Sequence, residues 1–215
     1  MATETVPDKP LLRGWLHLGM SVLVVLGGVL LLVLAPGVLG KAGSAVWLAG
    51  AMILFGMSAI YHIGHWSPSV KATLRRLDHA NIFIFIAATY TPLALVLLPG
   101  PEAAALLALI WTVAVVGVSV RMFWQTAPRW LDVVCYLLLG WAGIGWLPAF
   151  WVNGGPTIVI LIGVGGLVYS LGALVYARKW PDPSPKWFGF HEIFHACTIV
   201  AALCHFAAIA LAVLR

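Results

Sequence analysis

Long apolar runs alternate with short polar breaks along the whole chain of 215 residues. A helix that spans a bilayer needs about 20 mostly apolar residues, and every run is close to that length. The breaks, such as "APGVLGKAG", "HWSPSVK" and "KWPDPSPK", are rich in the proline and glycine that end helices. The pattern therefore predicts an all-α integral membrane protein, a seven-transmembrane helix bundle. The predicted spans are 11–35, 43–65, 74–98, 103–121, 130–150, 156–177 and 190–214.

The basic residues predict the orientation of this bundle. If the spans alternate across the bilayer, one side collects ten of the twelve lysines and arginines, and only Lys41 and Arg215 fall on the other. Cytoplasmic loops carry the excess of positive charge, so we expect a cytoplasmic N-terminus and an external C-terminus. Residues 1–10 are then a cytoplasmic N-terminal tail, and 11–215 form a single transmembrane domain in the cell (inner) membrane, which the chain crosses several times. The ten residues are Lys9, Arg13, Lys71, Arg75, Arg76, Arg121, Arg129, Arg178, Lys179 and Lys186.

Composition excludes several other classes of protein. Hydrophobic residues make up 62% of the chain and charged residues 9%, whereas soluble domains average about 25% charged residues. The net charge of +5 reflects a scarcity of acids and not basic runs, so no nucleic-acid partner is expected. The three cysteines are odd in number and lie in apolar spans, which argues against a disulfide framework. Nothing in the pattern indicates an oligomeric state.

Three spans that are distant in sequence carry polar residues to one predicted depth. Ser58 and His62 lie in the last turns of the second span, Asp78 opens the third, and His191 and His195 open the seventh. With alternating spans, all five residues lie in one layer near the cytoplasmic side. Ionisable groups in hydrocarbon are costly without partners, so each is a candidate for function.

The histidine spacing favours a metal site. His191 and His195 are four residues apart and project from one face of a helix. A third histidine would complete the three protein ligands of a catalytic zinc, with a fourth position open to water. His62 is the favoured third ligand, although His65 lies only three residues away. The alternative is a set of interfacial histidines, each hydrogen-bonded to the backbone or to lipid head groups.

The segment "HEIFH" also matches the H-E-x-x-H pattern of zinc peptidases, in which the glutamate is the general base. An intramembrane metalloprotease would require a further aspartate ligand on a later helix. Here the motif lies on the last span, and no acidic residue follows Glu192. We therefore interpret the segment as a pair of zinc-binding histidines, with Glu192 incidental or adjacent to the ligands.

Other polar residues receive separate interpretations. His205 lies fourteen residues beyond His191, roughly 20 Å further along the helix, and is expected to be a buried, hydrogen-bonded histidine. His17 either flanks the site or lies at the interface. Asp132 is expected to pair with Arg129, three residues before it.

Three segments together resemble the hemolysin III family, which belongs with the progestin and adipoQ receptors. They are "SAIYH" at 58–62, "LRRLDHANIFIFIAATYTP" at 74–92 and "HEIFHACTIVAALCHF" at 191–206. The resemblance implies that zinc is held by His62, His191 and His195. It also implies that Asp78 positions the water on the zinc and that Ser58 lies in the same polar shell. The wider group is similar to alkaline ceramidases, which implies hydrolysis of an amide bond in a membrane lipid.

The favoured function is therefore zinc-dependent hydrolysis of a lipid acyl bond, with membrane lipids as the substrate. Asp78 is the best proton acceptor because it is acidic and separate from the three ligands, and Ser58 either donates to the developing oxyanion or is structural. Two alternatives stay open. One is a pore-forming cytolysin, and the other is a receptor or regulator of membrane homeostasis that uses zinc structurally.

Overall fold

A computed structural model describes residues 9–124 and 128–215. Nearly all of these residues are helical. In chain order the helices are α1 (Trp15–Leu34), α2 (Gly37–Ile63), α3 (Pro68–Leu97), α4 (Gly100–Phe123), α5 (Arg129–Trp141), the short 3₁₀ helix η1 (Ala142–Trp146), α6 (Leu147–Gly154), α7 (Pro156–Arg178) and α8 (Phe190–Val213).

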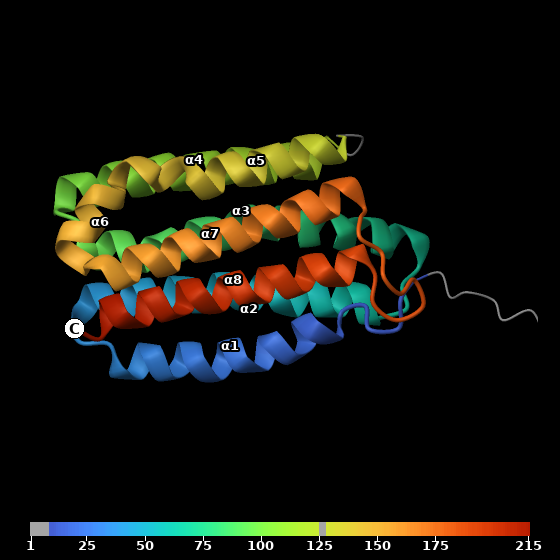
Figure 1. Cartoon of the computed structure of the whole chain (residues 1–215), viewed down its shortest axis with the longest axis horizontal. Coiled ribbons are helices and arrows are strands. Elements are labelled where there is room, and N and C mark those ends of the chain that lie inside the picture. The colour runs from blue at the N-terminus through green and yellow to red at the C-terminus, as the bar shows by residue number, and fades with distance from the viewer. Residues whose placement is uncertain (1–8, 125–127) are drawn as a thin grey trace, which may run out of the picture.

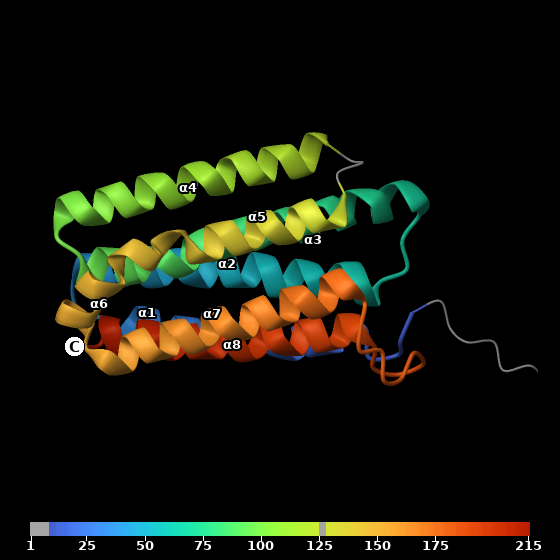
Figure 2. The same cartoon turned by 45° about the horizontal axis from the view of Figure 1, so that its top comes forward.

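Seven helical crossings lie side by side along the long axis of the molecule (Figure 1). Six are single helices, and the seventh runs from Arg129 to Gly154 through α5, η1 and α6. The prediction of a seven-helix transmembrane bundle is therefore confirmed. The last helix, α8, contacts α1, α3 and α7, while α4 lies at one edge of the bundle (Figure 2).

The fifth crossing is interrupted where the sequence predicted one continuous span, 130–150. The Tyr90 hydroxyl donates to the carbonyl of Gly140 and accepts from the N–H of Gly143, so it satisfies backbone groups that the helix releases. A side chain at Gly143 would lie 2.4 Å from the Tyr90 ring. An inserted side chain is a known cause of helix breaks, and here it comes from α3.

Small residues let α2 and α3 approach closely. A Cβ atom at Gly43 would lie 2.6 Å from the Pro92 backbone, and one at Gly50 would lie 2.5 Å from Ala88. Small residues at helix contacts are the usual basis of tight packing within membranes. This contact places the end of α2 against the beginning of α3, where the candidate polar residues lie.

Ten of the twelve basic residues lie at one end of the bundle, where α2, α4 and α7 end and α3, α5 and α8 begin. We call this the basic end. The asymmetry predicts that the basic end is cytoplasmic. Reporter fusions after Arg121 and Lys179 should therefore read cytoplasmic, and fusions after Gly100 and Arg215 should read external. A cytoplasmic reporter after Arg215 would reverse the predicted orientation.

Candidate metal centre

The five residues predicted to share one layer do so, near the basic end. Ser58 and His62 come from the last two turns of α2, Asp78 from α3, and His191 and His195 from the first turns of α8. All are buried except His191, which is half-buried. Three helices thus supply one buried polar cluster near the basic end of the bundle.

His62, His191 and His195 form a group with the dimensions of a metal site. Each offers one ring nitrogen, and the three nitrogens lie within 4.8 Å of one another. The Nε2 atoms of His62 and His191 are 3.3 Å apart. Two nitrogens bound to one tetrahedral zinc at 2.0–2.1 Å would be about 3.3–3.4 Å apart. The three residues could therefore hold a metal ion, and the His62–His191 pair has the spacing that zinc requires.

His65 does not belong to this group. It follows the end of α2 at Ile63 and is exposed. Of the two histidines considered as a third ligand, only His62 has a ring nitrogen near those of His191 and His195.

Asp78 lies next to His62 without belonging to the group of three histidines. Its Oδ2 is 3.8 Å from Nε2 of His62, and the Ser58 side chain lies close enough to interact with its carboxyl group. Ser58 is 2% exposed, so this contact is shielded from competing water. The arrangement holds one carboxylate beside the candidate ligands in a fixed orientation.

His79, beside Asp78 in sequence, has partners for both ring nitrogens. Its Nδ1 is 2.8 Å from the Arg75 carbonyl oxygen, which can only accept, so Nδ1 carries the proton. Its Nε2 therefore accepts from the Tyr176 hydroxyl at 3.2 Å. Both ring nitrogens are engaged, and the ring ties α3 to α7.

Both carboxylate oxygens of Glu192 have partners, which argues against the peptidase-like role. One of its oxygens accepts from Nε of Arg13, and the other accepts from the N–H of Gly189 at 2.8 Å. The side chain is 1% exposed. Glu192 therefore caps α8 and fastens the segment before α1 to the helix that presents His191 and His195. Its partner Arg13 is 179 residues away, which no local pattern indicates.

His17 flanks the centre and does not lie at the interface. It is 3% exposed, and its ring stacks on that of His195 with the centroids 3.7 Å apart. Neither of its nitrogens has a hydrogen-bond partner in the described part of the chain. Unpaired polar atoms are costly inside a protein, and here they adjoin the His62, His191 and His195 group.

Two other expectations have different outcomes. The Arg129–Asp132 pair is wrong: Asp132 pairs with Arg121 of α4 at 3.3 Å, while the Arg129 guanidinium lies 4.6 Å from the centre of the Tyr176 ring. The neighbouring antiparallel helix offers a closer partner than the residue one turn earlier. His205 is hydrogen-bonded as expected, with Nε2 3.2 Å from the Ile162 carbonyl oxygen.

Comparison with known proteins identifies the family. A family model described as Haemolysin-III related matches residues 6–206. Hemolysin-3 of Bacillus cereus is 29% identical over 177 residues, 80% of each chain. Monocyte to macrophage differentiation factor of Homo sapiens is 27% identical over 199 residues, 90% of this chain and 79% of that protein. Heptahelical transmembrane protein ADIPOR2 of Oryza sativa subsp. japonica is 28% identical over 180 residues, 76% of this chain and 79% of that one. Since the family model covers almost the whole chain and the relatives share its length, this membrane protein belongs to the Haemolysin-III related family, among the progestin and adipoQ receptors.

Proposed function

We propose that the protein is a zinc-dependent hydrolase that cleaves an amide or ester acyl bond of a membrane lipid. The observation that carries this proposal is the group of three histidine nitrogens with a separate carboxylate, Asp78, beside it. His62, His191 and His195 would hold the ion. A zinc ion bound there would supply an acidified water and a Lewis acid that polarises the scissile carbonyl.

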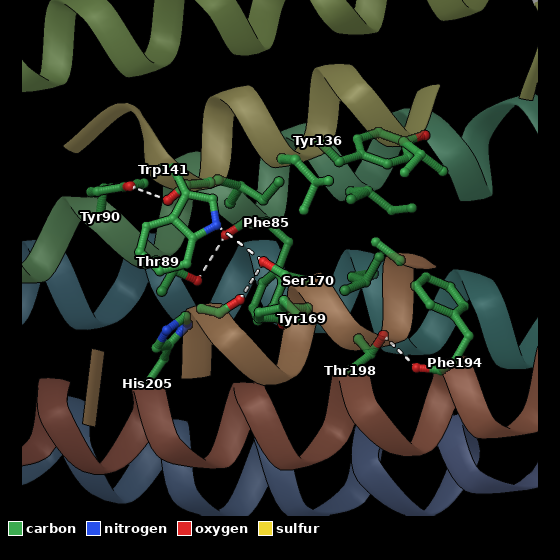
Figure 3. A pocket seen from close by; sticks show the side chains of 18 of the residues that line it. Phe85, Thr89, Tyr90, Tyr136, Trp141, Tyr169, Ser170, Phe194, Thr198 and His205 are labelled. Atoms are coloured by element: carbon green, nitrogen blue, oxygen red, sulfur yellow. Dashed lines mark hydrogen bonds between the residues drawn. The ribbon is translucent and has the colours of Figure 1, made fainter. Parts of the chain in front are cut away.

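A narrow cavity extends from this group into the bundle and supports a lipid substrate. It has a volume of about 150 Å³ and is lined mostly by α3, α5, α7 and α8. Along α8 its lining includes His191, Phe194, Thr198 and His205, a length of roughly 20 Å. Figure 3 shows Phe194 and Thr198 toward one side of the cavity and His205 and Tyr90 toward the other. An elongated, mostly apolar space of this kind suits an acyl chain whose reactive end lies at the histidines.

Asp78 is the residue placed to move the proton. Hydrolysis adds a water oxygen to the acyl carbon, breaks the C–N or C–O bond, and sends a proton to the leaving nitrogen or oxygen. Asp78 would accept a proton from the water and return it to the leaving group, which yields a fatty acid and an amine or alcohol. The Ser58 hydroxyl would hold the Asp78 carboxylate toward the histidines. Glu192 has no such freedom, because both of its oxygens are engaged.

The test is release of fatty acid from defined lipids by purified protein in nanodiscs. The panel contains one amide probe, N-oleoyl sphingosine, and one ester probe, monooleoylglycerol, each with and without a phosphate on the head group. We expect release from at least one probe by the zinc-loaded protein, loss of release after chelation, and recovery on adding zinc. Zinc-loaded protein that releases no fatty acid from any probe would contradict the proposal and favour a structural metal.

Pore formation is the alternative function to test, because one relative carries the name Hemolysin-3. The same nanodisc preparation is transferred to vesicles that contain a trapped dye. Dye leakage that persists after the zinc is removed, without fatty-acid release, would support a cytolysin. Fatty-acid release without leakage would support the hydrolase.

A further inference from the structure

A second, larger cavity opens at the basic end, and we call it the basic vestibule. Its volume is about 1000 Å³, and its walls include both His62 and His191. It therefore leads to the candidate metal centre from the end of the bundle, whereas the narrow cavity leads into the interior. Six cationic side chains line it: Lys9, Arg13, Lys71, Arg75, Arg121 and Arg129.

The acids near the vestibule do not balance this charge. Asp132 is the one acidic residue among those that line it in the described part of the chain. It pairs with Arg121, and Glu192 pairs with Arg13 from outside the lining. The vestibule therefore keeps a net positive charge.

Four of the six cations make no ion pair within residues 9–124 and 128–215: Lys9, Lys71, Arg75 and Arg129. Lys9 donates to the His62 carbonyl oxygen and the Arg129 guanidinium lies over the Tyr176 ring, whereas Lys71 and Arg75 are exposed on the first turns of α3. The pKa of Lys9, at the same mouth, is lowered by partial burial and then by the charges of Lys71 and Arg13. Neighbouring cations thus already repel one another here, and an anion would relieve that repulsion.

The rim of the vestibule has the character of a membrane interface. Trp15 and Trp66 line it and are exposed, and tryptophan is enriched at the level of lipid head groups. His79, Tyr176 and His191 line both the vestibule and the narrow cavity. A single amphiphile could therefore extend from one space to the other past the histidines.

We propose that the basic vestibule binds the anionic head group, a phosphate or carboxylate, of the lipid whose acyl chain enters the narrow cavity. This rests on the proposed function and narrows its substrate to anionic lipids. The charged head group of the lipid lies against Lys71 and Arg75, and its acyl chain lies along α8. The scissile bond, between head group and acyl chain, then lies at the three histidines. A neutral lipid of the same chain length would lose the charge-assisted contacts.

Binding of lipids that cannot be cleaved tests this separately from hydrolysis. The probes are 1-O-oleyl glycerol 3-phosphate and the neutral 1-O-oleyl glycerol, both ether-linked, with inorganic phosphate as the soluble source of the same anion. Affinity is measured for the zinc-loaded full chain in detergent micelles. We expect the phosphate lipid to bind at least tenfold more tightly than the neutral lipid, and this preference to shrink at high salt.

Adjacent arginines provide the matched control. Arg75 lines the vestibule, whereas Arg76 does not and instead donates to the Thr73 hydroxyl. The double variant Lys71→Gln, Arg75→Gln should weaken binding of the phosphate lipid by about 10–100-fold, while Arg76→Gln should leave it unchanged. Equal binding of the two lipids, or an equal loss in Arg76→Gln, would overturn the proposal. Inorganic phosphate that binds as tightly as the phosphate lipid would also overturn it, in favour of a soluble anion. Selective binding of the phosphate lipid by a protein that hydrolyses no lipid probe would instead contradict only the proposed hydrolase activity.

Discussion

We expect the wild-type chain to purify with close to one zinc ion and the His195→Ala variant to purify without it. The variant removes one of three nitrogens that lie within 4.8 Å of one another. Two imidazoles from different helices cannot complete a site that needs three protein ligands. His62→Ala and His191→Ala should have the same effect. The measurement is elemental analysis of metal per chain after purification without chelators, repeated after reloading with zinc.

The control for this experiment is His65→Ala, which should keep the metal. His65 is exposed and lies three residues beyond His62. The variant therefore removes the same kind of side chain but none of the three candidate ligands. The retained metal would also show that an alanine near this end of α2 is tolerated. His195→Gln serves as a second variant that keeps a polar side chain if alanine prevents folding. A wild-type chain that takes up no zinc on reloading would contradict the site, as would metal loss in His65→Ala alone.

The fold could be predicted from sequence because a bilayer imposes a length on each helix. Seven apolar runs of about 20 residues admit few other arrangements, and seven spans are observed. The interruption at 142–146 was not predictable in the same way. Its cause is the Tyr90 hydroxyl on another helix, which reaches Gly140 and Gly143. Hydropathy measures how apolar a run is and carries no information on which side chain inserts into it.

The centre of the site could be predicted for a similar reason. Once the spans alternate, position in sequence becomes depth, and Ser58, His62, Asp78, His191 and His195 fall in one layer. Depth leaves rotation about each helix undetermined. The contacts that depend on rotation were therefore missed, among them the stacking of His17 on His195 and the pairing of Asp132 with Arg121.

Charge pairs between residues far apart in sequence could not be predicted either. The sequence marks Glu192 as part of a peptidase motif, yet in the fold it pairs with Arg13 and caps the beginning of α8. The one available signal was that a buried carboxylate needs a cation, and ten basic residues share the predicted side. The basic vestibule could not be predicted either. The sequence places ten basic residues on one side of the membrane, but only the fold shows which six of them line the cavity that leads to the histidines.

The largest kinetic effect is expected for Asp78→Asn. Asparagine keeps the shape of the side chain and can still accept a hydrogen bond from Ser58, but it cannot take a proton from water. General-base assistance is typically worth about 10²–10⁴-fold, so the rate of fatty-acid release should fall by that order. Zinc content should stay near that of the wild type, because the Asp78 oxygen lies outside the nitrogen group. Turnover of the lipid probe that the wild type cleaves fastest and the amount of metal per chain are measured on the same preparation.

Glu192→Gln is the matched comparison, since it makes the same chemical change in the other buried carboxylate of the centre. Glutamine can still accept from the Gly189 N–H, but it leaves the Arg13 charge without its partner. We expect the melting temperature to fall by several degrees while turnover stays within about tenfold of wild type, because a broken ion pair affects stability and no proton transfer is lost. If Glu192→Gln abolished turnover and Asp78→Asn did not, the proton acceptor would be Glu192 and the peptidase-like chemistry would return. Loss of zinc in Asp78→Asn would instead make Asp78 a ligand, and the centre would have no free carboxylate to act as a base.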